Sequence, residues 1–223
     1  MIVSVNMSMT ADGQVRVPAE ENLDRIGNRA DLERMKKLRR ESDAILVGAG
    51  TVIADNTALG VGEEHIRERQ GLQYPLRICL TGRQMPYFES RIFKPELGGT
   101  TFLFCGEYEF PMAERLYKDC KVICKGKGHH PKIQKVLSYL ERELAVEKLL
   151  VEGGPFINGA FLRADLVDYY HVTMCPYIFG GSDSHCYTPF WGFNVENKND
   201  RKFVITEMER SDDWVFLTYR RDR

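Results

Sequence analysis

The sequence lacks the features that mark membrane, secreted and nucleic-acid-binding proteins. No stretch approaches the roughly 20 apolar residues that a membrane-spanning helix needs. The first residues, MIVSVNMSMTADG, contain no basic segment followed by a long apolar one, so we expect no signal peptide. A formal net charge of −1 gives no electrostatic reason to expect nucleic acid or an anionic membrane as a partner. We therefore expect a cytoplasmic protein whose cysteines are reduced.

Several cofactor and metal signatures are absent as well. There is no Walker A motif, and the pattern His-x-Glu followed by Pro-Cys-x-x-Cys, which marks zinc deaminases, does not occur. Cys120, Cys124, His129 and His130 do lie close together. However, both cysteines fall in the apolar run CKVICK, where alternate residues face a core. We favour core cysteines over a structural metal, assign no metal ligand, and expect the histidines to be surface or packed residues.

Apolar runs alternate with stretches of helical periodicity along most of the 223 residues. The runs predict strands over 1–8, 43–48, 77–81, 100–105, 121–125, 148–153, 168–179, 202–209 and 213–221. Helical spacing predicts helices over 28–42, 111–119, 131–145 and 158–166, with Asn28 as the N-cap of the first. We expect most basic residues of this first helix to form a solvated face. The order of strands and helices indicates an α/β fold of three layers, α/β/α, with a mostly parallel sheet and a C-terminal antiparallel hairpin that turns at Ser211 and Asp212. We expect a single domain over 1–223, with surface loops at 60–74 and 190–201.

The first segment that suggests a ligand site is DAILVGAGTVIADN. A buried strand leads into Gly48 and Gly50, whose missing Cβ atoms let the backbone approach a phosphate. Thr51 offers a hydroxyl group, and Asp55 offers an acceptor for ribose or carboxamide groups. The third glycine of a Rossmann fingerprint is absent, so a tight strand-to-helix turn remains the alternative.

The second segment is LLVEGGPFINGAFL. Another buried strand meets Gly153 and Gly154, and we expect a helix to start after them. Glu152 lies at the carboxyl end of this strand, where ligands of open α/β sheets bind. The alternative for a single glutamate at a strand end is a solvated rim residue. Two such turns in one chain favour an extended dinucleotide as the ligand.

Together, DAILVGAGTVIADN and LLVEGGPFINGAFLRADLVDYYHVTMCPYIFGG resemble the signature segments of the riboflavin-biosynthesis pyrimidine reductase family. The family includes the C-terminal domain of bacterial bifunctional deaminase/reductases and has a dihydrofolate reductase-like fold. NMSMTADGQ near the start also resembles the family's first strand and turn. The resemblance covers residues 3 to 182 and implies a homodimeric oxidoreductase that uses NADPH.

The resemblance also implies roles for individual residues. The residues implied to bind the cofactor are Thr51, Asp55, Thr81, Arg83, Gly153, Gly154, Pro155, Phe156, Ile157 and Asn158. Arg83 suits the 2′-phosphate of NADPH because a guanidinium group matches a phosphate, although a surface arginine is the alternative. The residues implied to bind the substrate are Arg39, Leu59 and Glu152. Glu152 is also our candidate for holding the substrate over the nicotinamide ring.

The segment after Asp55 departs from the family pattern. The family places a proline where this chain has Thr57, and a second phosphate-binding arginine where it has Gly62. A lost charge-assisted contact costs on the order of 1.5–3 kcal/mol, enough to change substrate choice. We therefore expect a reductase that converts the ribosyl group of a phosphorylated ribosylaminopyrimidine to ribityl. The alternatives are a reductase of a pterin-like or secondary-metabolite heterocycle and a non-catalytic NADP-binding protein.

Overall fold

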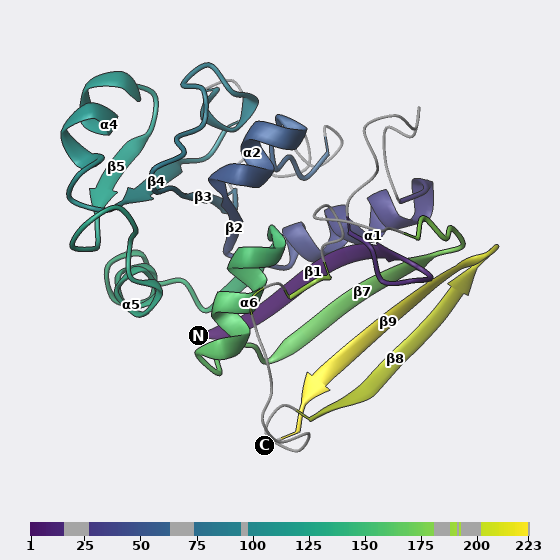
Figure 1. The fold of residues 1–223 in the computed structure, drawn as a ribbon. Helices are drawn as coiled ribbons and strands as arrows, with labels where there is room; N and C mark the ends of the chain where they lie inside the picture. Colours follow the sequence, from purple (N-terminus) through teal and green to yellow (C-terminus); the bar gives the residue numbers. More distant parts are fainter. Residues whose placement is uncertain are drawn as a thin grey trace. The chain divides into compact units, whose positions relative to one another are not determined.

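The computed structural model describes residues 1–15, 27–62, 74–94, 98–180, 188–190, 192 and 202–222 (Figure 1). The predicted loops 60–74 and 190–201 therefore lie mostly outside the described residues. The described chain forms two compact units. Unit 1 contains Met1 and residues 36–150, and unit 2 contains residues 2–35 and 151–223. The predicted single domain over 1–223 stays a prediction.

Unit 1 is built on parallel strands in the order β5-β4-β3-β2-β6. Strands β2, β3 and β4 span Ala44–Gly48, Leu76–Leu80 and Thr101–Cys105, while β5 spans Lys121–Cys124 and β6 spans Lys148–Val151. Every residue of β2 and β4 is buried, as expected for strands whose two faces are both covered. These strands correspond closely to the apolar runs of the sequence.

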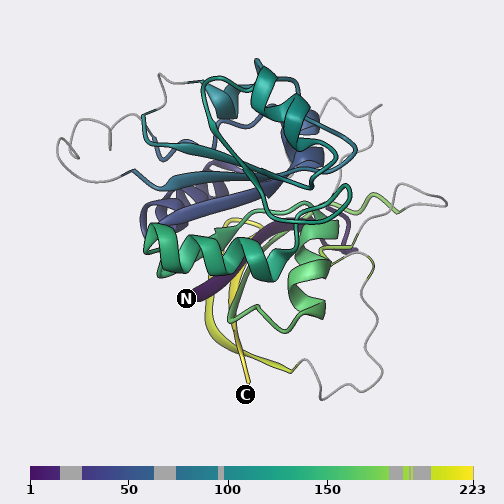
Figure 2. The ribbon, with the colours of Figure 1, turned by 90° about the vertical axis from the view of Figure 1, so that its left-hand side faces the viewer.

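The helices of unit 1 cover an apolar core. They are α2 (Ala49–Asp55), α4 (Phe110–Leu116), α5 (Ile133–Leu144) and the short 3₁₀ helix Arg91–Phe93. Figure 2 shows α5 running alongside the strands of this unit. The helix buries Val136, Leu137 and Leu140, which follow the helical spacing seen in the sequence.

Unit 2 contains the parallel pair β1 (Ile2–Thr10) and β7 (Tyr169–Cys175). Next to β7 lies the antiparallel hairpin of β8 (Phe203–Ser211) and β9 (Trp214–Arg221), which gives the order β1-β7-β9-β8. Helix α6 (Pro155–Arg163) also belongs to this unit, together with the first half of α1 (Arg29–Arg40). The predicted fold class, a mostly parallel α/β arrangement with a C-terminal antiparallel hairpin, is confirmed.

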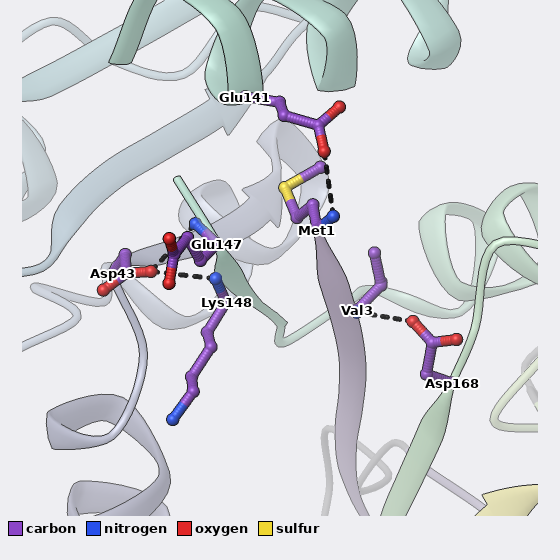
Figure 3. A network of polar contacts seen from close by, with 7 residues as sticks. All are labelled: Met1, Val3, Asp43, Glu141, Glu147, Lys148 and Asp168. Atoms are coloured by element: carbon purple, nitrogen blue, oxygen red, sulfur yellow. Dashed lines mark hydrogen bonds and ion pairs between the residues drawn. The ribbon is translucent and has the colours of Figure 1, made fainter. Parts of the chain in front are cut away.

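An aspartate before one strand of each unit holds the start of a neighbouring strand (Figure 3). In unit 1, Asp43 Oδ2 accepts hydrogen bonds from the backbone N–H groups of Glu147 at 2.9 Å and Lys148 at 2.8 Å. In unit 2, Asp168 Oδ2 accepts a hydrogen bond from Val3 N at 2.9 Å. These carboxylates satisfy donors at the strand starts, so they help to set which residues pair.

The first half of helix α1 makes polar contacts with the strands of unit 2. Asp31 accepts hydrogen bonds from Ser8 Oγ at 3.0 Å and Thr173 Oγ1 at 2.5 Å. Arg34 donates to the carbonyl of Leu217 at 2.9 Å. Most basic residues of α1 were expected to form a solvated face. Arg34 is an exception: it is half-buried, because hydroxyl and carbonyl groups of the strands accept its hydrogen bonds.

Four local predictions need correction. Residues 49–55 form α2, where we expected a turn, and α6 begins at Pro155 instead of residue 158, because proline suits the first turn of a helix. The 3₁₀ helix Arg91–Phe93 was not predicted. The hairpin turns at Asp212 and Asp213, since Ser211 already pairs with Trp214.

No helix in the described ranges combines the length and apolar character needed to cross a membrane.

Candidate active site

The turn after β6 is the most constrained part of the predicted cofactor site. Gly153 has a φ of +91°, and a Cβ atom at this position would lie 2.9 Å from Met7 Cε. The backbone conformation therefore favours glycine, and a side chain here would have to displace the flexible end of Met7. The following peptide bond, Gly153–Gly154, is cis. Gly154 is the N-cap of α6 and Pro155 follows at its first turn, so the chain changes here from strand to helix within a few residues.

The side chains of this turn differ in how far they are buried. Glu152 is half-buried between β6 and Gly153, while Phe156 is 58% exposed. Asn158 is fully buried, and its Nδ2 donates a hydrogen bond to Pro189 O at 3.1 Å. Its Oδ1 is buried and has no hydrogen-bond partner among the described residues. The Nδ2 group of Asn158 therefore links α6 to Pro189, and its backbone N–H donates to Gly154 O at 3.1 Å.

The first glycine turn leads directly into α2. Gly48 is the N-cap, and Thr51 and Asp55 lie one helical turn apart, on the same face of the helix. Thr51 is half-buried and Asp55 is exposed. A Cβ atom built on Gly50 would meet nothing within 4 Å, so no neighbouring atom requires a glycine there. The helix ends at Asn56, whose φ is +44° and whose Oδ1 accepts a hydrogen bond from Arg91 N at 2.9 Å.

The predicted substrate residues Arg39 and Leu59 belong to neighbouring parts of unit 1. Arg39 is only 6% exposed, and its Nη1 donates to Gly60 O at 2.8 Å. Leu59 has a φ of +52° and buries its side chain in the apolar core, which leaves its backbone for ligand contacts. Arg39 is therefore a second exception to the mostly solvated basic face of α1, because its guanidinium group holds the backbone after α2.

Thr81 and Arg83 follow β3 in unit 1. Thr81 is buried, and its hydroxyl donates to Gln84 O at 3.0 Å, so the side chain closes the turn after the strand. Arg83 is exposed. Unit 1 thus carries Arg39, Thr51, Asp55, Leu59, Thr81 and Arg83, and unit 2 carries Glu152 to Asn158.

The cysteines match the sequence prediction in part. Cys79, Cys105 and Cys175 are buried, whereas Cys120 and Cys124 are partly buried. The pKa of the Cys105 thiol is raised to about 12, mainly by burial. This thiol therefore stays protonated and unreactive at neutral pH. Within the described ranges, no group of three or more His, Cys, Asp or Glu side chains is arranged to hold a metal ion.

The sequence interpretation missed an ordered cluster in unit 1. His129 Nδ1 lies 2.6 Å from Glu109 Oε1, and Glu109 is only 7% exposed. The rings of Tyr108 and His129 meet edge to face at 4.9 Å. The sequence feature that could have drawn attention to this cluster is the run KGKGHHPK, which has three lysines, two histidines and no acidic residue.

Comparison with known proteins identifies the family. The model of the RibD C-terminal domain matches residues 1–213. The chain belongs to the RibD C-terminal domain family. A curated relative from Archaeoglobus fulgidus, named 2,5-diamino-6-ribosylamino-4(3H)-pyrimidinone 5′-phosphate reductase, is 30% identical over 186 residues, which cover 82% of this chain and 83% of the relative. The predicted family and the predicted enzyme class, an oxidoreductase, are confirmed.

Solved structures support the same fold for this RibD C-terminal domain. RibD from Acinetobacter baumannii (form 1) matches with a TM-score of 0.75 at 20% identity, covering all of this chain and 58% of the other. A dihydrofolate reductase from Enterococcus faecalis matches with a TM-score of 0.51 at 14% identity, over all of this chain and 97% of the other. The predicted dihydrofolate reductase-like fold is therefore confirmed.

Proposed function

We propose that this RibD C-terminal domain is an NADPH-dependent reductase of a phosphorylated ribosylaminopyrimidine in riboflavin biosynthesis. The observation that carries the proposal is the turn after β6, where Gly153 has a φ of +91° that favours glycine and Glu152 lies at the strand's carboxyl end. The curated archaeal relative is named for this substrate class. A turn without side chains that opens onto a helix N-terminus fits the pyrophosphate of a dinucleotide.

The ligand contacts of this proposal are those that the family resemblance implies. The turn of residues 153–158 would meet the pyrophosphate, Thr51 and Asp55 would hold ribose or carboxamide groups, and Thr81 and Arg83 would meet the adenosine end. Arg39, Leu59 and Glu152 would hold the substrate. We also propose that residues 1–223 form a single reductase domain.

When bound, NADPH supplies a hydride to the imine-like carbon of the ring-opened ribosyl group, which becomes ribityl. The task of this chain is to orient the two ligands and to exclude water from the reacting carbon. The Glu152 carboxylate accepts hydrogen bonds from the substrate and fixes its position. Because the substrate nitrogen must gain a proton, water at the half-buried Glu152 is the proposed donor.

A substrate other than the phosphorylated pyrimidine is the second candidate. Gly62 stands where the family has a phosphate-binding arginine, and its φ of +101° is one that an arginine adopts only with strain. This stretch of backbone is therefore shaped for glycine. The observation favours a heterocycle whose binding does not depend on that second phosphate contact.

We also propose that the protein is cytoplasmic and forms a homodimer. Strand β8 is the outermost strand of unit 2, and Ile205 and Met208 on it are 55% and 72% exposed. A second copy of the chain would cover these apolar side chains and the strand edge. Light scattering coupled to size exclusion would then give twice the mass of 25.7 kDa, and Met208→Glu would shift the protein toward the monomer.

The test of the catalytic proposal combines cofactor binding with turnover. NADPH and NADH are titrated against the purified protein, and NADPH oxidation is followed with the ribosylaminopyrimidine phosphate and with dihydrofolate. We expect binding of NADPH and turnover of the pyrimidine. Glu152→Gln should lower kcat about 100-fold while the Kd for NADPH stays within about twofold. Glu143→Gln, an exposed position on α5, is the matched control.

The outcomes separate the candidate functions. A protein that binds neither nucleotide would refute the reductase proposal. NADPH binding with turnover of a different heterocycle would favour the second candidate, and NADPH binding without any turnover would favour a non-catalytic NADP-binding protein.

A further inference from the structure

The side chain of Asp31, in the first turn of α1, lies against the parallel strands β1 and β7 of unit 2. Its Oδ2 accepts a hydrogen bond from Ser8 Oγ at 3.0 Å, and its Oδ1 accepts one from Thr173 Oγ1 at 2.5 Å. Ser8 and Thr173 are direct partners in the parallel register, two residues before the last pair, Thr10 and Cys175. The carboxylate is therefore held near the carboxyl ends of these strands, the edge where ligands of α/β sheets bind.

The turn after β6, which holds the cofactor in the proposed function, lies against the same part of β1. A Cβ atom on Gly153 would lie 2.9 Å from Met7 Cε, and Met7 directly precedes Ser8. Residues 2–35 and 151–223 belong to one compact unit, so β1 relates the positions of this turn and of Asp31 to each other. Asp31 is thus placed beside the predicted reaction site instead of at a remote end of the strand.

The contacts of Asp31 leave its carboxylate able to bind a ligand. A carboxylate oxygen can accept two hydrogen bonds, and in the part of the chain that the structure describes each oxygen of Asp31 accepts one. Thr173 is fully buried, so its hydroxyl fixes the orientation of the carboxylate, while Asp31 itself is only half-buried. Each oxygen therefore has one acceptor position that an N–H group of a ligand can fill.

Arg34, one helical turn after Asp31, makes its shortest hydrogen bonds to β9. Its Nη2 donates to Leu217 O at 2.9 Å and to Thr218 Oγ1 at 3.3 Å, whereas its Nη1 lies 3.5 Å from Thr173 Oγ1. The hydrogen-bond donors at Asp31 are thus neutral hydroxyl groups. A negatively charged acceptor that is oriented in this way favours a ligand with two adjacent N–H donors.

We propose that Asp31 selects the pyrimidine by its C2 substituent, by pairing with a 2-amino group and the adjacent N3–H of a 2-aminopyrimidinone. The inference rests on the proposed function, because it assumes that the substrate is a ribosylaminopyrimidine phosphate. Two adjacent N–H donors match the two oxygens of a carboxylate and form a bidentate, charge-assisted pair. Asp31 is then a specificity-determining residue that touches the ring, while the hydride is delivered to the ribosyl carbon.

The chemistry at C2 explains the selection. Hydrolytic deamination converts the 2-amino group to a carbonyl group, so a uracil ring has an acceptor where the aminopyrimidinone has a donor. The carbonyl oxygen would face an oxygen of Asp31 with no hydrogen between them. A site built to accept a hydrogen bond strongly disfavours a ligand that lacks the donor, because both acceptors are left without a partner.

The test uses two substrates that differ only at C2, the 5′-phosphates of 2,5-diamino-6-ribosylaminopyrimidinone and of 5-amino-6-ribosylaminouracil. NADPH oxidation by the full chain gives kcat/KM for each. We expect the wild type to prefer the 2-amino substrate about 100-fold. Asp31→Asn offers one acceptor and one donor, which match N3–H and the C2 carbonyl of uracil, so it should abolish or reverse the preference. Asp213→Asn, at the exposed turn of the hairpin, is the matched control.

Two further measurements separate selection from a structural role. Calorimetry with the ribityl products of both substrates gives Kd values that need no hydride transfer, and we expect Asp31→Asn to change their ratio in the same direction. Thr173→Val removes a hydroxyl that orients Asp31 and should reduce the preference about tenfold, whereas Thr173→Ser keeps the hydroxyl and should restore it. In all these variants the Kd for NADPH should stay within about twofold of the wild type.

The possible results distinguish this inference from the proposed function. Equal kcat/KM of the wild type for the two substrates would overturn the inference and leave an NADPH-dependent pyrimidine reductase in place. An unchanged preference in Asp31→Asn, or loss of both activities with unchanged affinity for both ribityl products, would also overturn it. Neither turnover nor binding of either pyrimidine by the wild type would overturn both proposals.

Discussion

The clearest pH-dependent stability effect is expected at His171, in unit 2. Its Nδ1 lies 3.1 Å from Thr218 Oγ1, in the polar region under the first half of α1. Burial and then the positive charge of Arg34 lower the pKa of His171 from 6.5 to about 4, although Glu207 acts in the opposite direction. The imidazole is therefore neutral in the folded protein at neutral pH.

The direction of the effect follows from where the proton binds. Between pH 6.5 and about 4, the unfolded chain binds a proton at His171 and the folded chain does not. The free energy of unfolding therefore falls as the pH falls through this window, and the contribution of His171 is constant outside it. The lowered pKa corresponds to roughly 3 kcal/mol, and partial solvent access makes about 2 kcal/mol the expected loss.

Urea unfolding of the wild type and of His171→Gln at several pH values measures this loss. Glutamine keeps a polar partner for Thr218 but has no proton to bind, so the variant should lose about 2 kcal/mol less than the wild type between pH 7 and about 4.5. His130→Gln removes an exposed histidine and should follow the wild type. Parallel losses in the wild type and His171→Gln would refute the reasoning.

Three further predictions concern residues that hold or shape the backbone. Asp43→Ala removes the acceptor of two backbone hydrogen bonds and should lower the free energy of unfolding in urea by about 2 kcal/mol; an unchanged value would show that the carboxylate contributes nothing. Gly153→Ala should lower the free energy of unfolding by roughly 1–3 kcal/mol and weaken NADPH binding, whereas Gly50→Ala should not lower stability. Differential scanning fluorimetry and NADPH titration of both variants measure these effects. Gly62→Arg should lower the melting temperature through strain and lower KM for the phosphorylated pyrimidine; an unchanged KM would argue against that substrate.

Most elements could be predicted from the sequence because their signals are local. The buried strands β2 and β4 are short, nearly continuous apolar runs, and α5 shows helical spacing of its apolar residues. Asn28 was predicted as an N-cap, and its Oδ1 does accept a hydrogen bond from Asp31 N at 2.9 Å. Helix α2 was missed because Gly50 and the β-branched residues at 51–53 disfavour a helix, and contacts with the core override that preference.

The environment of the site residues depends on contacts between distant parts of the chain, which periodicity does not reveal. Arg39 and Gly60 are separated by 21 residues, and their hydrogen bond shows that the guanidinium group supports the backbone beside Leu59. Glu109 and His129 are 20 residues apart, and neither belongs to a motif. Their pairing follows from the parallel register of β4 and β5, which brings the segments after both strands together.

The sequence by itself determined the family, the α/β order of elements and the two glycine turns, because these depend on short segments read in order. Tertiary structure decided why glycine is needed at particular positions. Gly50 has open space around it, whereas a Cβ atom on Gly106 or Gly126 would lie 2.1 Å from a backbone oxygen atom, that of Gly128 or His130 respectively. Residue identity fixes the backbone freedom of a glycine, but only packing shows whether neighbouring atoms use the space that it leaves.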